Sequence, residues 1–161
     1  MLISSATFEE EFENVLQADQ DVLYFSLSKN ISGNYNSARL AAEEVMDKEI
    51  NGRKIRLIDT LNASLAQGIL AIYASEMRDK GMAVDAVADV MESYVGKMNG
   101  VFTVGDLKYL SRTGRIKGRV ATIGNVLKIK PILRGDKDGY IVTYKNVSRR
   151  KADFNTLVNL D

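Results

Sequence analysis

Residues 22–47 read VLYFSLSKNISGNYNSARLAAEEVMD, and this stretch decides the fold. Its first part, Val22 to Phe25, is a run of branched and aromatic residues that is typical of a buried strand. Residues 26–34 form a polar segment rich in serine and asparagine, with one glycine. Residues 35–47 place small and apolar side chains at helical spacing. The stretch therefore predicts a strand, a short loop and a helix in direct succession.

The loop of this unit has the composition of an anion site. Ser28, Ser32 and Asn34 carry hydroxyl and amide groups, and Gly33 allows a ligand to approach the backbone closely. The N-terminus of a helix leaves backbone amides without partners and carries a partial positive charge. The loop therefore predicts binding of a carboxylate or phosphate. The alternative is that Ser32 or Asn34 only caps its own helix.

A second strand and helix follow at residues 54–58 and 63–80. Connections this short predict parallel strands, whose following loops lie at the same edge of the sheet. Ligands of open parallel sheets bind at that edge. Asp59 and Thr60, which end the second strand, therefore join the predicted site. The alternative is that Asp59 or Asn62 caps the second helix.

The remaining sequence predicts further elements on both sides of this unit. They are a helix capped at Thr7 and running over residues 8–16, a helix at 84–97, a strand at 101–104, a helical turn at 106–111, a helix at 121–127, an edge strand opened by Pro131, a hairpin turn at 135–139, a strand at 140–144 and a helix that starts at Ser148. We place a domain boundary near residues 96–100. The fold class is then α/β, with residues 1–97 as part of a three-layer α/β/α domain holding the ligand loop. Residues 98–161 would be part of a second α+β domain with a mixed or antiparallel sheet.

Composition excludes several classes of function. The chain has 161 residues, of which 45% are hydrophobic, and its 22 basic and 21 acidic residues give a net charge of +1. This balance argues against a nucleic-acid partner. The chain contains no histidine and no cysteine, which excludes the usual triads and thiolate metal sites, and we predict no catalytic residue and no metal. No apolar run approaches the ~20 residues of a membrane span. We therefore expect a cytoplasmic protein without stable membrane insertion.

Three motifs resemble those of a known family. They are residues 28–38, SKNISGNYNSA; residues 59–68, DTLNASLAQG; and residues 107–116, LKYLSRTGRI, followed by residues 127–133 and 138–141. Their content and order resemble the DegV family, bacterial proteins that bind one fatty acid. The resemblance covers about Ile3 to Ala152.

The resemblance implies a carrier that holds the carboxylate of a fatty acid with hydroxyl and amide donors and its acyl chain in an apolar tunnel. Ser32 matches the serine that the family places at the carboxylate, and Asn34 replaces the family threonine. The family's earlier Thr-Ser pair falls near Ser4 and Ser5. The expected ligand-binding residues are Ser4, Ser5, Ser28, Ser32, Gly33, Asn34 and Thr60. No cofactor is expected besides the bound fatty acid.

In some members the loaded carrier presents its acid to a separate fatty acid kinase, so the resemblance implies such a partner. Arg112 and Arg115 lie in a basic stretch around glycines, which predicts either a solvated loop or a docking site for a phosphate or a partner. Side chains on helix faces and the third strand are candidates for the tunnel wall, with ordinary core as the alternative. These candidates are Leu70, Ile72, Met77, Met91, Val101 and Phe102.

The sequence also departs from the family pattern. A full member begins with a strand that carries an Asp-Ser element, and it ends with further strands and a histidine that reaches the carboxylate. The resemblance therefore implies an internal fragment, whose exposed sheet edges predict self-association. Two other functions stay open. The first is a phosphate-binding enzyme domain that uses the helix N-terminus and the Arg112 to Arg119 loop, and the second is a fragment without a function of its own.

Overall fold

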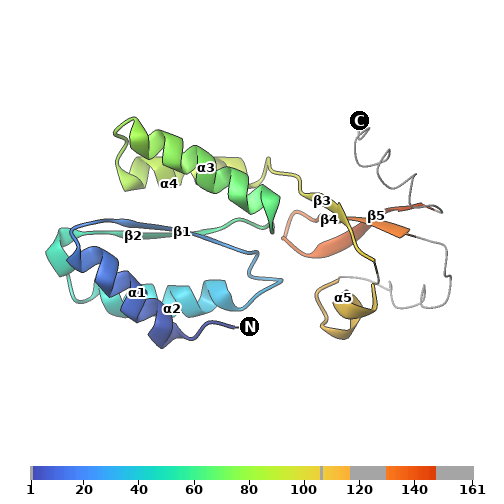
Figure 1. Cartoon of the computed structure of the whole chain (residues 1–161), viewed down its shortest axis with the longest axis horizontal. Helices are drawn as coiled ribbons and strands as arrows, with labels where there is room; N and C mark the ends of the chain where they lie inside the picture. Colours follow the sequence, from blue (N-terminus) through green and yellow to red (C-terminus); the bar gives the residue numbers. More distant parts are fainter. Residues whose placement is uncertain (1, 106, 117–129, 148–161) are drawn as a thin grey trace.

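The computed structural model describes residues 2–105, 107–116 and 130–147 (Figure 1). Its elements are α1 (Ser5–Gln17), β1 (Val22–Ser26), α2 (Asn34–Met46), the short 3₁₀ turn η1 (Ile50–Gly52), β2 (Ile55–Asp59), α3 (Leu65–Asp79), α4 (Val84–Val95), β3 (Val101–Thr103), α5 (Lys108–Arg112), β4 (Lys130–Gly135) and β5 (Ile141–Val147). The helices predicted at residues 121–127 and from Ser148 lie outside the described residues.

The first half of the chain forms three layers. Strands β1 and β2 pair in parallel, in a register that runs from Val22 opposite Ile55 to Ser26 opposite Asp59. Helices α1 and α2 cover one face of this sheet, and α3 and α4 cover the other (Figure 1). The predicted α/β/α arrangement with parallel strands is therefore confirmed.

The two faces of the sheet build two separate cores, because successive side chains of a strand point to opposite sides. Val22 and Tyr24 pack with α1 and α2, where Tyr24 makes edge contacts with the rings of Phe8 and Phe12. Leu23 and Phe25 pack instead with buried side chains of α3 and α4. A one-residue shift of β1 would exchange these two sets.

The second half is strand-rich and antiparallel, as predicted. Strand β4 lies between β3 and β5 in a three-stranded sheet. The hairpin turn between β4 and β5 is closed by two backbone bonds, from Asp136 N–H to Tyr140 O at 2.8 Å and from Gly139 N–H to Asp136 O at 2.9 Å. The predicted turn at residues 135–139 is therefore confirmed.

The prediction that Pro131 opens an edge strand is wrong, because β4 is the central strand. Pro131 is the second residue of β4. The pairing of β4 with β3 reaches back only to Ile132, so it does not include Pro131. Its missing N–H therefore interrupts none of the described pairing with β3. Thr103 Oγ1 donates to Pro131 O at 2.8 Å and so joins the two strands at this point.

The predicted cap of the first helix is also wrong. The N-cap is Ser4, whose Oγ accepts a hydrogen bond from Thr7 N–H at 3.2 Å. Thr7 instead lies in the first turn, where its hydroxyl pairs with that of Ser4 at 2.9 Å. A serine three residues ahead of the assumed cap offers the same chemistry, so the helix starts one turn earlier.

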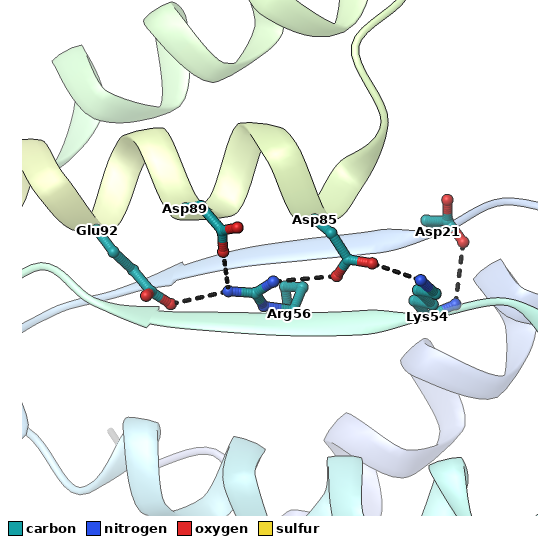
Figure 2. A network of polar contacts seen from close by, with 6 residues as sticks. All are labelled: Asp21, Lys54, Arg56, Asp85, Asp89 and Glu92. Atoms are coloured by element: carbon teal, nitrogen blue, oxygen red, sulfur yellow. Dashed lines mark hydrogen bonds and ion pairs between the residues drawn. The ribbon is translucent and has the colours of Figure 1, made fainter.

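An ion network joins α4 to β2 (Figure 2). The Arg56 guanidinium contacts Asp85 and Asp89 at 3.0 Å and Glu92 at 3.1 Å, and Lys54 also pairs with Asp85. The bonds with Asp85 and then Asp89 raise the pKa of Arg56, and those with Lys54 and then Arg56 lower the pKa of Asp85. The network therefore fastens α4 to the start of β2.

Candidate functional site

The loops that follow β1 and β2 lie side by side at one edge of the parallel sheet. We call residues 27–33 the first loop and residues 60–64 the second loop. Ser28 N–H donates to Asn62 O at 2.9 Å, and Thr60 Oγ1 donates to Ser26 O at 2.7 Å. The prediction that the two polar loops share one edge is therefore confirmed.

The first loop is contacted by the β4–β5 turn of the second sheet and by Arg115, which follows α5. Asn30 Nδ2 donates to Asp138 O in the β4–β5 turn at 2.7 Å, and Arg115 Nε donates to Ile31 O at 3.2 Å. Gly139 has a φ of +81°, and a Cβ on it would lie 2.3 Å from Ser28 Oγ. Only glycine therefore allows the turn to approach Ser28 this closely.

Asn62 connects the second loop to the segment that leads into β3. Its Nδ2 donates to Thr60 O at 3.0 Å and to Met98 O at 3.2 Å, and its Oδ1 accepts from Gly100 N–H at 3.3 Å. The side chain is buried, and these bonds satisfy both ends of its amide. Asn62 thus fixes the position of the second sheet against the first.

An apolar cavity of about 300 Å³ lies between the second loop and the second sheet. It is lined by Ile31, Leu61, Asn62, Ala63, Ser64, Leu65, Ala66, Gly100, Val101, Phe102, Gly135 and Ile141. Two of these residues have unusual backbones, Leu61 with a φ of +51° and Ser64 with a φ of +56°. A left-handed conformation is costly for a residue other than glycine and is often found at functional sites.

Ser28 and Thr60, both predicted ligand-binding residues, are fully buried, and their hydroxyls have partners inside the protein. Ser28 Oγ accepts from Asn30 N–H at 3.3 Å, and Thr60 Oγ1 donates to the carbonyl of Ser26. Both side chains therefore set the shape of the loops.

Ser32, Gly33 and Asn34 lie where the first loop enters α2. Ser32 is half-buried, and its Oγ accepts from Asn34 N–H at 3.3 Å. Gly33 is the N-cap residue of α2 and is exposed. Asn34 Oδ1 accepts from Ile3 N–H at 3.1 Å, so the start of the chain lies against this junction. Ser32 thus accepts one long hydrogen bond and is partly exposed.

Ser4 is the N-cap of α1 and Ser5 is its first residue, and both follow directly after Leu2 and Ile3. Leu2 packs beside Gly33, since a Cβ on Gly33 would lie 2.9 Å from a methyl group of Leu2. Together with the bond from Ile3 to Asn34, this contact brings the start of α1 close to the start of α2. The hydroxyl of Ser4 is engaged with Thr7.

The hypothesis that Asp59 or Asn62 caps α3 is wrong. The N-cap residue is Ser64, and its side chain makes no capping bond. Asp59 Oδ1 instead accepts from Lys29 N–H at 3.3 Å and from Leu61 N–H at 3.1 Å. Asp59 therefore ties the two loops together.

The candidates for the tunnel wall separate into two groups. Val101 and Phe102 line the apolar cavity. Leu70 and Met91 are fully buried in the core between the sheet and α3 and α4, Met77 packs against that core, and Ile72 is 58% exposed. Leu70, Met77 and Met91 therefore follow the alternative of ordinary core, and Ile72 does not line this cavity. Helical spacing shows that a face is apolar and does not show which surface the face contacts.

The basic segment contributes one described contact to the site. Arg115 reaches the first loop through Ile31 O, and its Nη1 also donates to Thr113 O at 2.6 Å. Arg112 is exposed at the end of α5. The predicted loop from residue 117 to Arg119 lies outside the described residues.

Two further findings concern metals and membranes. Within residues 2–105, 107–116 and 130–147, acidic side chains do not gather in a group of three that would suit a metal ion. No helix in this part of the chain has the length and apolar character needed to cross a bilayer.

Several residues of the cavity were not predicted from the sequence as site residues, among them Ile31, Leu61, Ser64 and Ile141. Leu61 and Ser64 belong to the motif at residues 59–68, so the motif contained a signal for them. Ile141 carried no local signal, because its place in the cavity depends on the antiparallel sheet.

Comparison with known proteins identifies the family. The model of the family described as "Uncharacterised protein, DegV family" matches residues 1–160. The chain belongs to the DegV family. A DegV domain-containing protein of Clostridium perfringens is 34% identical over 155 residues, which are 96% of this chain and 53% of that protein. The chain thus spans about half the length of the curated relatives it matches.

Solved DegV structures share the fold. A structure from Thermotoga maritima described as a DegV lipid-binding protein has a TM-score of 0.82 and 30% identity, covering 98% of this chain and 52% of that one. A DegV family protein from Thermus thermophilus, whose description reports fatty acid binding, also has a TM-score of 0.82, with 29% identity and coverage of 98% and 54%. The mixed α/β fold with one parallel and one antiparallel sheet is the DegV fold.

Proposed function

We propose that this chain forms the central part of a fatty-acid-binding DegV carrier. The observation that carries the proposal is the apolar cavity, which is lined by residues of the two polar loops, the start of α3 and the second sheet. Burial of an acyl chain contributes roughly 0.8 kcal/mol per methylene, so an apolar wall supplies most of the affinity and a few donors orient the head. The related proteins described as binding lipid or fatty acid support this assignment.

The proposed carboxylate site is the junction of the first loop with α2. Ser32 is its central donor, since this residue is only half-buried, and Gly33 and Asn34 complete the junction. Ser4 and Ser5 approach it from α1, while Ser28 and Thr60 hold the loops in shape. We assign the chain no catalytic residue and no cofactor, and we expect it to act in the cytoplasm by binding alone.

A partner that acts on the bound acid, such as a fatty acid kinase, would meet the basic segment. The contact of Arg115 with the first loop places a cation next to the proposed head site, and Arg112 is exposed nearby in the sequence. The division into domains at residues 1–97 and 98–161 completes the proposal, with the cavity between the two.

The test measures lipid retention directly. The chain is purified gently and analysed by native mass spectrometry, and delipidated protein is titrated with oleate. We expect one bound acid per chain and weaker retention in Ser32→Ala. Ser93→Ala is the matched control, because Ser93 is exposed on α4 and its Oγ donates to Val90 O at 2.7 Å.

Two results would contradict the proposal. Folded protein that neither retains an acid nor binds oleate would leave the chain without this function. Thermal stabilisation by inorganic phosphate with no effect of oleate would favour the phosphate-binding enzyme domain instead.

A further inference from the structure

Ser64, the N-cap residue of α3, has an unusual backbone. Its φ is +56° and its ψ is −124°, whereas an N-cap residue ordinarily has an extended backbone with a negative φ. In that ordinary geometry the serine hydroxyl accepts a hydrogen bond from an amide of the first helical turn. The side chain of Ser64 makes no such bond. Its carbonyl accepts from Gly68 N–H at 3.0 Å, so the backbone of Ser64 starts the helix without the hydroxyl.

The conformation of Ser64 is costly. A positive φ is unfavourable for a residue with a Cβ, and glycine is the residue that adopts it freely. Such a backbone persists only where its surroundings hold it in place. The helical bond from Gly68 fixes the chain after Ser64, and the buried amide of Asn62, bonded to Thr60 O and Met98 O, fixes the chain before it. Residues held in this way cluster at ligand clamps and active sites.

Ser64 also contributes a polar group to the apolar cavity. Among the described residues that line this cavity, Ser64 and Asn62 are the two with polar side chains. The amide of Asn62 is engaged at both ends, since it donates to Met98 O and accepts from Gly100 N–H. Within the part of the chain that the structure describes, the hydroxyl of Ser64 has no hydrogen-bond partner. A hydroxyl can donate one hydrogen bond and accept two, so this capacity is left for a ligand.

We propose that Ser64 is a second hydrogen-bond donor to the carboxylate of the acid whose chain fills this cavity. This role of Ser64 rests on the proposed function and adds a donor from the second loop to the donor of the first. Ile31 of the first loop lines the same cavity and directly precedes Ser32, the central donor of the proposed carboxylate site. A carboxylate has two oxygens with about four acceptor positions, so hydroxyls from both loops can bind it together.

The place of Ser64 in the cavity wall favours the head of the acid over its chain. Ser64 and Leu65 are exposed, whereas Ala66, which lines the same cavity, is buried. Ser64 therefore lies at the outer end of the wall that α3 contributes. An ionised head is costly to bury without partners, so it stays at that outer end while the chain enters the cavity. A hydrogen bond to a charged acceptor is stronger than one to a neutral acceptor.

Two variants of Ser64 separate the hydroxyl from the strained backbone. Ser64→Ala removes the hydroxyl and keeps the strain, whereas Ser64→Gly removes both. We expect titration calorimetry to show ~10-fold weaker binding of oleate for both variants. We expect urea unfolding to give Ser64→Ala the midpoint of the wild type and Ser64→Gly a higher one. A residue with a structural role alone would not combine weaker binding with unchanged or greater stability.

The matched control is Ser93→Ala on α4, outside the cavity, which should bind oleate like the wild type. Oleyl alcohol has the same chain with an uncharged head, and its affinity should fall much less in Ser64→Ala. Equal losses for oleate and oleyl alcohol would place Ser64 in the chain wall and overturn its role at the head. A lower midpoint for Ser64→Gly than for Ser64→Ala would contradict the strain on which the free hydroxyl depends.

The same titrations distinguish a failure of this role from a failure of the proposed function. If the wild type binds oleate and both Ser64 variants bind it equally well, Ser64 is not a donor and the proposed function stands. If the folded wild type binds no oleate, the proposed function is contradicted, and the role of Ser64 with it.

Discussion

The side chain of Asn62 accepts a hydrogen bond from Gly100 N–H at 3.3 Å and donates one to Met98 O at 3.2 Å. The buried amide of Asn62 thus contacts two residues, Met98 and Gly100, that lie 36 and 38 positions further along the sequence. This relationship sets the distance between the second loop and the first residues of the second sheet, and both line the apolar cavity.

Replacement of Asn62 by alanine should therefore destabilise the chain by about 1–3 kcal/mol, because it leaves buried backbone groups without partners. Urea unfolding measures this loss. Asn99→Ala is the control, since Asn99 is exposed and its amide makes only one long bond, to Lys97 O at 3.4 Å. Equal stability of the two variants would show that the amide of Asn62 does not hold the sheets together.

Gly139 tests the contact between the β4–β5 turn and the first loop. Gly139→Ala adds the cost of a left-handed backbone, about 1–2 kcal/mol, to a Cβ that would lie 2.3 Å from Ser28 Oγ. Gly52→Ala separates the two effects, because Gly52 has a φ of +64° with open space around its Cβ position. We expect thermal unfolding to show a clearly larger loss for Gly139→Ala. If the two losses were equal, the turn would not press on Ser28.

Phe102 tests whether the cavity holds the acyl chain. Truncation to alanine removes part of the apolar wall, so we expect affinity for oleate to fall about tenfold or more, or ~1.4 kcal/mol. Leu40→Ala removes an exposed apolar side chain from α2, outside the cavity, and should leave affinity unchanged. Titration calorimetry compares the two. An unchanged affinity in Phe102→Ala would place the ligand elsewhere.

The sequence allowed correct prediction of the parallel layers, because periodicity and short connections are local signals. The meeting of the loops after β1 and β2 follows from the same reasoning. Pro131 was predicted to open an edge strand because proline has no N–H to donate. In the structure, the pairing of β3 with β4 stops at Ile132, so the missing N–H of Pro131 costs no bond to β3. Local propensity does not contain this information.

The cavity itself was beyond prediction from local pattern. Val101 and Phe102 were proposed for the tunnel wall together with Leu70 and Met91, and all four are apolar residues in predicted elements. Whether such a residue faces a cavity or a core depends on long-range bonds such as those of Asn62. These bonds join residues that lie far apart in the sequence, and a local periodicity does not predict such pairs.

The ion network makes the stability of the chain depend on pH in the acid range. Lys54 and then Arg56 lower the pKa of Asp85 below its usual value, which is about 3.9 in an unfolded chain. The unfolded chain therefore binds a proton at a higher pH than the folded chain does. Stabilisation by Asp85 is present above the unfolded pKa and is lost as the pH falls through the folded pKa.

We expect Asp85→Asn to lower the urea midpoint at pH 7 and to have little effect at pH 2. Asp79→Asn is the control, since Asp79 pairs only with its exposed neighbour Arg78 along the surface of α3. A difference between wild type and Asp85→Asn that stayed constant over this range would show that the charge of Asp85 does not fasten α4 to β2.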